Sequence, residues 1–239
     1  PYDPTGTTLK YRPGKGVRYL SASAIEQYAS CPMSFYLERI MGFKREDDIH
    51  DWLDESVYGT IVHDVFEKIY NEQLKSSPEG AVITADIIDS IISAPHKIEN
   101  YITRAINEFH LRKGKECYDE FHRELQLTRE VIAENVRKVL EREKAFAPFT
   151  YLHSEWNEYT RLTFTNSEGQ SESITLICRI DRIDRCHNNP DIDRIRVIDY
   201  KTGGDDTHTP SFAKSFDDHK VKAFLQLMIY CQALEHIEG

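Results

Sequence analysis

Two segments, Arg179-Ile-Asp-Arg-Ile-Asp184 and Val197-Ile-Asp-Tyr-Lys-Thr-Gly203, decide the expected fold of this chain. Each segment contains apolar residues that either alternate with polar ones or follow one another directly, and both patterns are typical of β-strands. The stretch between them, His187-Asn-Asn-Pro-Asp191, carries the Asn and Pro residues that favour a turn. The sequence therefore predicts a β-hairpin.

The register of this hairpin brings acidic side chains together. A turn centred on Pro190 pairs residues whose numbers add up to 380, so Asp181 faces Asp199 across the strands. Directly opposed residues have Cβ atoms about 4.5–5.5 Å apart. Because side chains alternate along a strand, Lys201 shares the face of Asp199, whereas Tyr200 points to the opposite face and into the core. Three polar groups converge on one face.

Opposed carboxylates suggest a cation between them, since two like charges destabilise a hairpin. Hard oxygen ligands suit Mg²⁺ or Mn²⁺, which also bind phosphate oxygens. Lys201 can then orient or help to deprotonate an attacking water and stabilise charge in the transition state. An exposed hairpin held by an Asp–Lys pair is the alternative, but it leaves unexplained why the acids lie among Ile180, Ile183, Val197 and Ile198.

Helical patterns precede the hairpin. Ser21 to Glu26 offers a helix start, with Ser23 and Glu26 as a capping box, and Cys31-Pro32 then separates two short helices. A stronger helix begins near Gly59 and places His63 and Glu67 one turn apart. Further apolar periodicity predicts helices over 83–92, 98–111, 116–127, 128–144 and 216–237, and strands over 151–165, 172–186 and 194–201.

This order of elements predicts an α/β (α+β) fold, because helices come first, then strands, then a closing helix. We expect a single domain over 1–239, mainly helical over 1–150, with the sheet core and closing helix over 151–239. The chain begins without Met and ends inside a helical pattern, so a fragment of a longer chain is expected.

Composition limits the class of protein. Apolar content of 40% can fill a core, and the absence of a long apolar run or leader predicts a soluble, cytoplasmic protein with no membrane partner. Five cysteines without a CxxC pair argue against a zinc ribbon or a disulfide framework. The net charge of -10 opposes nucleic-acid binding, although basic clusters occur at 10–18, 112–115 and 137–144. Solvated surface is the alternative for those clusters.

Several motifs together resemble the PD-(D/E)XK nucleases, and more closely the nuclease domains of the RecB and AddB helicase-nucleases and related CRISPR-associated exonucleases. The resemblance runs from residue 20 to about 234. Five motifs carry it. They are an opening helix with Cys-Pro (Leu20–Pro32), a histidine helix (Gly59–Glu67), a GxxD-like strand (Asp181), a D-x-K core (Asp199–Lys201) and a QxxxY helix (Gln226–Tyr230).

The resemblance implies a restriction-endonuclease-like core with a mixed central sheet, flanking helices and a helical N-terminal insertion. It also implies that a metal ion, Mg²⁺ or Mn²⁺, is held by His63, Asp181, Asp199 and the main-chain carbonyl of Tyr200, with Lys201 as the catalytic lysine. Glu67 would lie beside the site or bind a water. Gln226 and Tyr230 would support Lys201 or touch the DNA backbone.

The sequence departs from the family pattern at two cysteines. Cys178 stands where the family usually has Gly before the Asp. AddB-type proteins hold an iron–sulfur cluster with a Cys at the position of Cys31 and three more beyond the QxxxY helix, and this chain ends before them. A cluster is therefore not expected, and Cys31 is interpreted as a buried core thiol. Tyr28, Phe35 and Tyr36 could stack on bases, but helical spacing favours a place in the core.

The leading hypothesis is a Mg²⁺-dependent DNA nuclease, expected to be an exonuclease acting in DNA repair or recombination. Its DNA ends or single strands would come from a helicase part of the same chain or a partner helicase subunit. An inactive nuclease-like module that binds DNA or acts as a scaffold is the alternative. A metallohydrolase for small molecules would need further histidine ligands, and the chain has no HxH or HExxH pattern.

Overall fold

The computed structural model of the protein describes residues 19–43, 55–75, 80–112, 122–187, 194–202 and 222–235. Residues 188–191 of the predicted turn and the basic cluster at 10–18 lie outside the described residues. The chain divides into two compact units, and each is described by itself. One comprises 1–49, 156–179 and 206–239, and the other, called here the helix-rich unit, comprises 50–155 and 180–205.

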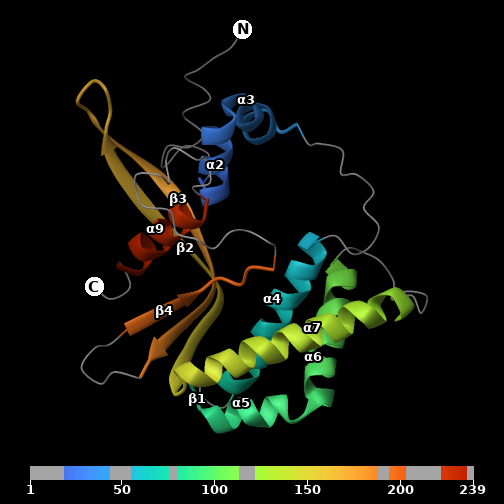
Figure 1. Cartoon of the computed structure of the whole chain (residues 1–239). Helices are drawn as coiled ribbons and strands as arrows, with labels where there is room; N and C mark the ends of the chain where they lie inside the picture. Colours follow the sequence, from blue (N-terminus) through green and yellow to red (C-terminus); the bar gives the residue numbers. More distant parts are fainter. Residues whose placement is uncertain are drawn as a thin grey trace. The chain divides into compact units, whose positions relative to one another are not determined.

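Four helices that pack against one another build most of the described helix-rich unit, and Figure 1 shows the short strand β1 beside α5 at one end of them. They are α4 (Glu55–Leu74), α5 (Ala85–Ile92), α6 (Pro95–Arg112) and α7 (His122–Glu143). Thr84 caps α5 by accepting a hydrogen bond from the main-chain N–H of Ile87. The expected helices over 83–92, 98–111 and 128–144 are thus confirmed, with α7 beginning earlier than expected.

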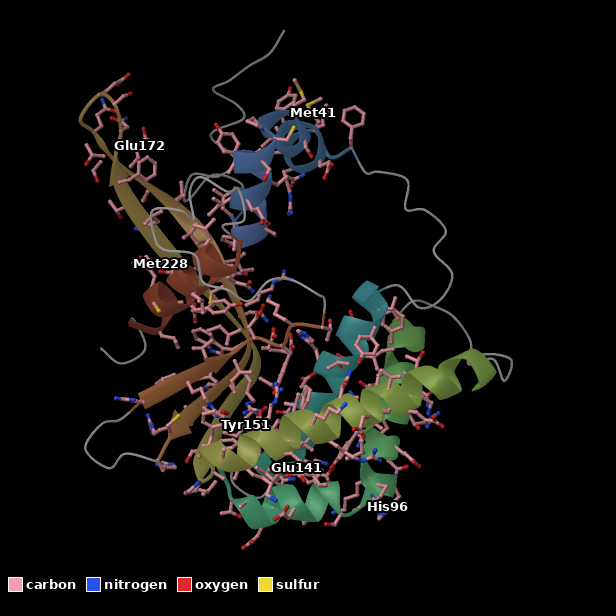
Figure 2. All side chains as sticks on the ribbon, viewed as in Figure 1. Met41, His96, Glu141, Tyr151, Glu172 and Met228 are labelled. Atoms are coloured by element: carbon pink, nitrogen blue, oxygen red, sulfur yellow. The ribbon has the colours of Figure 1, made fainter. Side chains whose placement is uncertain are left out.

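The core of this unit forms where apolar side chains recur every three or four residues along α4. Val62, Val65, Phe66 and Ile69 are buried, as the spacing predicts. Side chains from α5, α6, α7, β1 and β2 complete the same cluster. Tyr151 of β2, labelled in Figure 2, is fully buried in it and donates a hydrogen bond from its hydroxyl to Asn71 Oδ1 at 2.6 Å. This core fixes the helix that carries His63.

The sheet has the order β1-β2-β3-β4. Its strands are β1 (Ala81–Ile83), β2 (Phe149–Thr165), β3 (Ser171–Cys186) and β4 (Arg194–Ile198). β1 pairs antiparallel with β2, and β3 pairs antiparallel with β4. A parallel bridge joins Leu20 to Leu176, so both strand directions occur. β1 was not predicted, because the three residues merge with the apolar pattern of the following helix.

The predicted register of the β3–β4 hairpin is confirmed. Arg182 pairs with Ile198 and Asp184 with Arg196, and the numbers of each pair add up to 380. In this register the next pair would be Asp181 with Asp199. β4 itself ends at Ile198, three residues before the predicted end of the strand.

The other unit contains α2 (Ala22–Ser30), α3 (Pro32–Phe35), a π-helical turn (Tyr36–Ile40) and α9 (Lys222–Glu235), with the adjoining parts of β2 and β3. α2 packs against α9. The expected bend at Cys31-Pro32 is present, because Pro32 starts a new helix.

Three expectations for this unit were wrong. The side chain that caps α2 is Ser21, which accepts from the main-chain N–H of Ala24, whereas Ser23 lies inside the helix. Cys31 is exposed, and its Sγ caps α3 instead of entering the core. Tyr28 is also exposed and contacts Phe35 edge-on. α3 has only four residues, too few to form the apolar face that the spacing suggested.

Among the described residues, no helix combines the length and the apolar character that a membrane span requires.

Candidate metal centre

His63 lies on α4, one turn after Gly59, and is half-buried. At Gly59, α4 comes close to Thr202: a Cβ atom at position 59 would lie 2.9 Å from Thr202 Oγ1. Such a separation is shorter than van der Waals contact allows. The absent side chain therefore lets α4 approach the segment that follows β4, and with it the predicted D-x-K residues.

Asp181 projects from β3 into the same region. Its side chain is 13% exposed, and its Oδ2 lies 3.5 Å from His63 Nδ1. The main-chain N–H of Tyr200 donates to Asp181 Oδ2 at 2.6 Å. The structure therefore brings together His63, Asp181 and the backbone of Tyr200, as the sequence predicts.

The contacts of His63 suit a metal-binding imidazole. Its Nε2 lies 2.9 Å from the main-chain oxygen of Tyr200, and a proton on Nε2 makes this a hydrogen bond. The lone pair of Nδ1 then faces Asp181. Metal-binding histidines commonly donate their other ring N–H to a carbonyl or carboxylate, which fixes the ring. Here the Tyr200 carbonyl accepts the hydrogen bond that fixes the His63 ring. The expected role of His63 as a metal ligand stays a prediction.

Glu155 is a member of the site that the sequence analysis missed. Its Oε1 lies 3.8 Å from His63 Nδ1, and donor atoms of His63, Glu155 and Asp181 all lie within 4.8 Å of one another. Glu155 belongs to β2 yet has φ of 45°, a conformation that is uncommon outside glycine. The only signal in the sequence was an acid on a predicted strand, and that carries little information.

Asp199 and Lys201 form an ion pair with each other just beyond the end of β4. Their side chains are 19% and 40% exposed, respectively. Among the described residues, the group whose donor atoms could share one ion consists of His63, Glu155 and Asp181, without Asp199. The expected ligand role of Asp199 stays a prediction, as does the catalytic role of Lys201.

Electrostatics make the site receptive to a cation. The pKa of Asp181 is raised to about 6, chiefly by burial and also by the charges of Asp199 and Glu155, against the lowering effects of His63 and the Tyr200 N–H. Burial lowers the pKa of His63, but Glu155, Asp181 and the Tyr200 carbonyl outweigh burial, so the net pKa is raised. Both groups therefore retain protons more readily than usual, Asp181 mainly because it is buried and His63 because acidic and carbonyl oxygens surround it.

Glu67 lies on α4 one turn after His63 and is partly buried. Burial, together with the charges of Glu155 and Asp64, raises the pKa of its carboxyl group, and Lys68 partly offsets the shift. Its Oε1 accepts a 3.4 Å hydrogen bond from Asn71. These interactions place Glu67 within electrostatic reach of Glu155.

Gln226 and Tyr230 lie on α9 and touch the backbone of β3. Tyr230 donates from its hydroxyl to the main-chain oxygen of Arg179 at 2.6 Å, and Gln226 Nε2 donates to that hydroxyl at 2.5 Å. Arg179 precedes Asp181 by two residues. The expected support of Lys201 by these two side chains, or their contact with DNA, stays a prediction.

The donor set fits a divalent cation. One imidazole nitrogen and two carboxylates converge; the carboxylates suit Mg²⁺ and Mn²⁺, and the imidazole is a usual ligand of first-row transition ions. Burial, and to a smaller extent the neighbouring carboxylates, raises the pKa of Asp181, and a bound cation would oppose this shift.

Comparisons with known proteins identify the family of the chain. The family model described as the PD-(D/E)XK nuclease superfamily matches residues 19–239. A protein from Clostridium perfringens (strain SM101 / Type A), named as a subunit of an ATP-dependent helicase/deoxyribonuclease, is 28% identical over 235 residues, which cover 94% of this chain and 18% of that protein. Proteins of the same name from Clostridium tetani and Thermoanaerobacter sp. are 26% and 24% identical and cover 90% of this chain.

The chain spans less than a fifth of the length of these curated relatives. The match nevertheless extends across both compact units and includes the histidine helix, the hairpin and α9. The helices and the four-stranded sheet agree with the predicted restriction-endonuclease-like fold. The chain belongs to the PD-(D/E)XK nuclease superfamily.

Proposed function

We propose that this chain is a metal-dependent deoxyribonuclease domain that hydrolyses phosphodiester bonds of DNA. The observation that carries the proposal is the convergence of His63, Glu155 and Asp181, with donor atoms within 4.8 Å of one another, beside the Asp199–Lys201 pair. Family membership supports the nuclease chemistry, and the names of the relatives support DNA as the substrate.

Each residue has a proposed part. His63, through Nδ1, would hold a divalent cation, Mg²⁺ or Mn²⁺, together with Asp181 and Glu155, and Asp199 would complete its ligands. The Tyr200 carbonyl, the other expected ligand, would reach the ion only after releasing His63 Nε2. Such an ion polarises a phosphate oxygen and lowers the pKa of a bound water. Lys201 orients the attacking water and stabilises negative charge that develops on the phosphate. Glu67 lies beside the site or binds a water there, and Gln226 and Tyr230 support Lys201 or touch the DNA backbone.

The wider setting is proposed from the relatives, which are named as helicase/deoxyribonuclease subunits. We propose one nuclease domain over 1–239 that acts as an exonuclease on DNA ends or single strands. The DNA would be delivered by a helicase part of the same protein or by a partner helicase subunit. Such a domain would serve DNA repair and recombination in the cytoplasm.

The test is cleavage of end-labelled single-stranded and double-stranded DNA, with and without Mg²⁺. The wild-type chain should cleave only with the metal ion, and Lys201→Ala should lower the rate by about 100-fold or more while preserving the fold. Lys138→Ala is the matched control, because Lys138 lies on α7 in an exposed ion pair with Glu134. The control variant should cleave at the wild-type rate.

Two results would contradict the proposal. If Lys201→Ala cleaved as fast as Lys138→Ala, the assigned chemistry would be wrong. If the wild-type chain neither cleaved DNA nor bound Mg²⁺ or Mn²⁺ in calorimetry, an inactive DNA-binding or scaffolding module would be the better description.

A further inference from the structure

The D-x-K segment lies beyond the regular hydrogen bonding of the sheet. β4 ends at Ile198, and residues 199–202 are not assigned to a strand or helix. Tyr200, in the middle of this segment, nevertheless makes contacts on both of its sides. Its N–H and carbonyl meet Asp181 and His63 in the candidate metal centre. Its side chain points the other way, into the core.

The side chain of Tyr200 is held by two groups. Its ring stacks on Phe66 of α4, with centroids 4.4 Å apart and planes 10° from parallel. Its hydroxyl accepts a hydrogen bond from Arg182 Nη1 at 2.8 Å. Burial raises the pKa of this hydroxyl well above its usual range, so it stays neutral at physiological pH. The hydroxyl is thus one end of a fixed contact to Arg182.

Arg182 is itself immobilised. It is 1% exposed, and its Nε and Nη2 donate to Asp184 Oδ2 at 3.2 and 2.9 Å. Its Nη1 also pairs with Glu143 Oε1 at 2.8 Å, and its guanidinium lies 4.1 Å from the centre of the Tyr70 ring. All three nitrogens of the guanidinium therefore donate to partners, and one of its faces lies against Tyr70.

The charges of this cluster balance. Arg196 donates to the same Asp184 Oδ2 from Nε and Nη2, at 3.1 and 2.6 Å, so two arginines face the two acids Asp184 and Glu143. Buried ion pairs of this kind often stabilise a fold no better than apolar side chains of similar volume, because desolvation offsets the attraction. A role in fixing the geometry of the site therefore explains this buried cluster better than a contribution to stability does.

We propose that Arg182 is a positioning residue for cleavage and acts through the hydroxyl of Tyr200. The contact orients the Tyr200 peptide, so that its N–H stays on Asp181 and its carbonyl stays on His63. The adjacent side chains, Asp199 and Lys201, are oriented by the same stretch of backbone. The inference rests on the proposed nuclease function and adds a buried determinant of its geometry.

Tyr200→Phe is the sharpest test, because it removes the hydroxyl and leaves the ring on Phe66. The kcat for DNA cleavage should fall about tenfold, the effect of losing one hydrogen bond to a charged group. The KM for DNA should stay within about twofold, since no DNA contact is removed. The Mg²⁺ or Mn²⁺ concentration needed for half-maximal stabilisation of the fold should rise.

The matched control is Tyr101→Phe. Tyr101 is a buried tyrosine of the same unit, 5% exposed, and its hydroxyl donates to Glu72 at 2.5 Å. Losing this hydroxyl should lower the melting temperature to a similar extent but leave kcat and the metal titration unchanged. A purely structural role of Tyr200 predicts that the two variants behave alike.

A double-mutant cycle tests the route through Tyr200. Arg182→Lys keeps the charge but loses the guanidinium fork, so kcat should fall in the wild-type background. In the Tyr200→Phe background the same substitution should cause no further loss of kcat, because the link is already absent. A full additional loss would overturn the proposed route.

Metal titration separates failure of this inference from failure of the proposed function. The metal-induced rise in melting temperature needs no DNA cleavage. If the wild-type chain binds the ion, an unchanged metal response and unchanged kcat in Tyr200→Phe overturn the positioning role alone. If the wild-type chain neither binds the ion nor cleaves DNA, the proposed function fails, and the positioning role fails with it.

Discussion

Asp181 is held in a setting that opposes its own ionisation. Its pKa is raised from 3.8 to about 6, chiefly by burial and then by neighbouring carboxylates. Between about pH 4 and 6 the folded protein therefore binds a proton that the unfolded chain has released. Stability falls as the pH rises through this window, and the full loss is present above about pH 6. A bound cation would remove this loss by neutralising the charge.

Asp181→Asn should consequently stabilise the metal-free protein and abolish cleavage. The amide keeps an oxygen for the Tyr200 N–H but carries no charge. The gain should be about 1–3 kcal/mol near pH 8 and close to zero near pH 4, where wild-type Asp181 is protonated. Thermal melts in EDTA at both pH values measure the difference. An equal loss of stability at the two pH values would show that burial of Asp181 is not the cause.

Glu155 offers a second prediction, because its charge and its backbone can be changed separately. Glu155→Gln should weaken Mn²⁺ binding by about tenfold through loss of one carboxylate, with stability nearly unchanged. Glu155→Gly should weaken binding equally but raise the free energy of unfolding by up to about 1 kcal/mol, since glycine adopts the φ of 45° without strain. Calorimetry and denaturant titrations check the two effects. Equal Mn²⁺ affinity in wild type and both variants would remove Glu155 from the site.

The same residue shows where prediction from the sequence ends. Asp181 and Asp199 were placed opposite each other from a turn signal and strand alternation, two strictly local rules. Glu155 has a positive φ, which the alternation of side chains along a strand does not predict. Its strand lies near His63 of α4, and nothing in the sequence predicts that these two elements meet. Long-range contacts without a periodic pattern leave no trace in a single sequence.

Among the elements, the β3–β4 hairpin is the one whose structure agrees best with the prediction from the sequence. Its register needs only a turn of defined centre, and the observed pairs agree with that centre. The predicted end of β4 was wrong. Tyrosine is a residue type common in strands, but the N–H and carbonyl of Tyr200 hydrogen-bond to Asp181 and His63. β1 and the cap of α2 were missed because three-residue strands and neighbouring serines give ambiguous local signals.

The contact between α4 and the segment after β4 yields a prediction at this scale. In Gly59→Ala the new Cβ would approach Thr202 Oγ1 to 2.9 Å, so either the helix or the D-x-K segment must move. Displacement of the segment shifts Lys201, which lies next to Thr202, and should lower kcat about tenfold. Steady-state cleavage kinetics measure this loss.

Rescue provides the control for this prediction. Thr202→Ala removes the atom that the new Cβ would meet, so the double variant Gly59→Ala/Thr202→Ala should regain most of the lost kcat. Thr202→Ala alone should cleave nearly as the wild type. A double variant that is no faster than Gly59→Ala would mean that helix propensity or another contact causes the loss.

For the whole molecule, the distribution of charge bears on how the proposed DNA substrate would be bound. The net charge is -10. In the basic cluster at 137–144, Arg137 and Lys138 pair with Glu134, and Lys144 pairs with Asp89. These contacts agree with the solvated-surface alternative. A chain of this charge lacks the cationic excess by which proteins displace counterions from DNA, so a metal ion in the centre would carry much of the attraction.

DNA binding by this chain should therefore depend on the divalent cation more than on monovalent salt. Lys201→Ala permits binding to be measured without cleavage, by fluorescence anisotropy of a labelled single strand. In EDTA the dissociation constant should be about 10⁻⁴ M or weaker, the range of non-specific binding. Mg²⁺ or Mn²⁺ should strengthen binding at least about tenfold, and Asp181→Asn should abolish that gain because the ion has lost a charged ligand. Tight binding in EDTA with a steep salt dependence would instead require a basic surface outside the described residues.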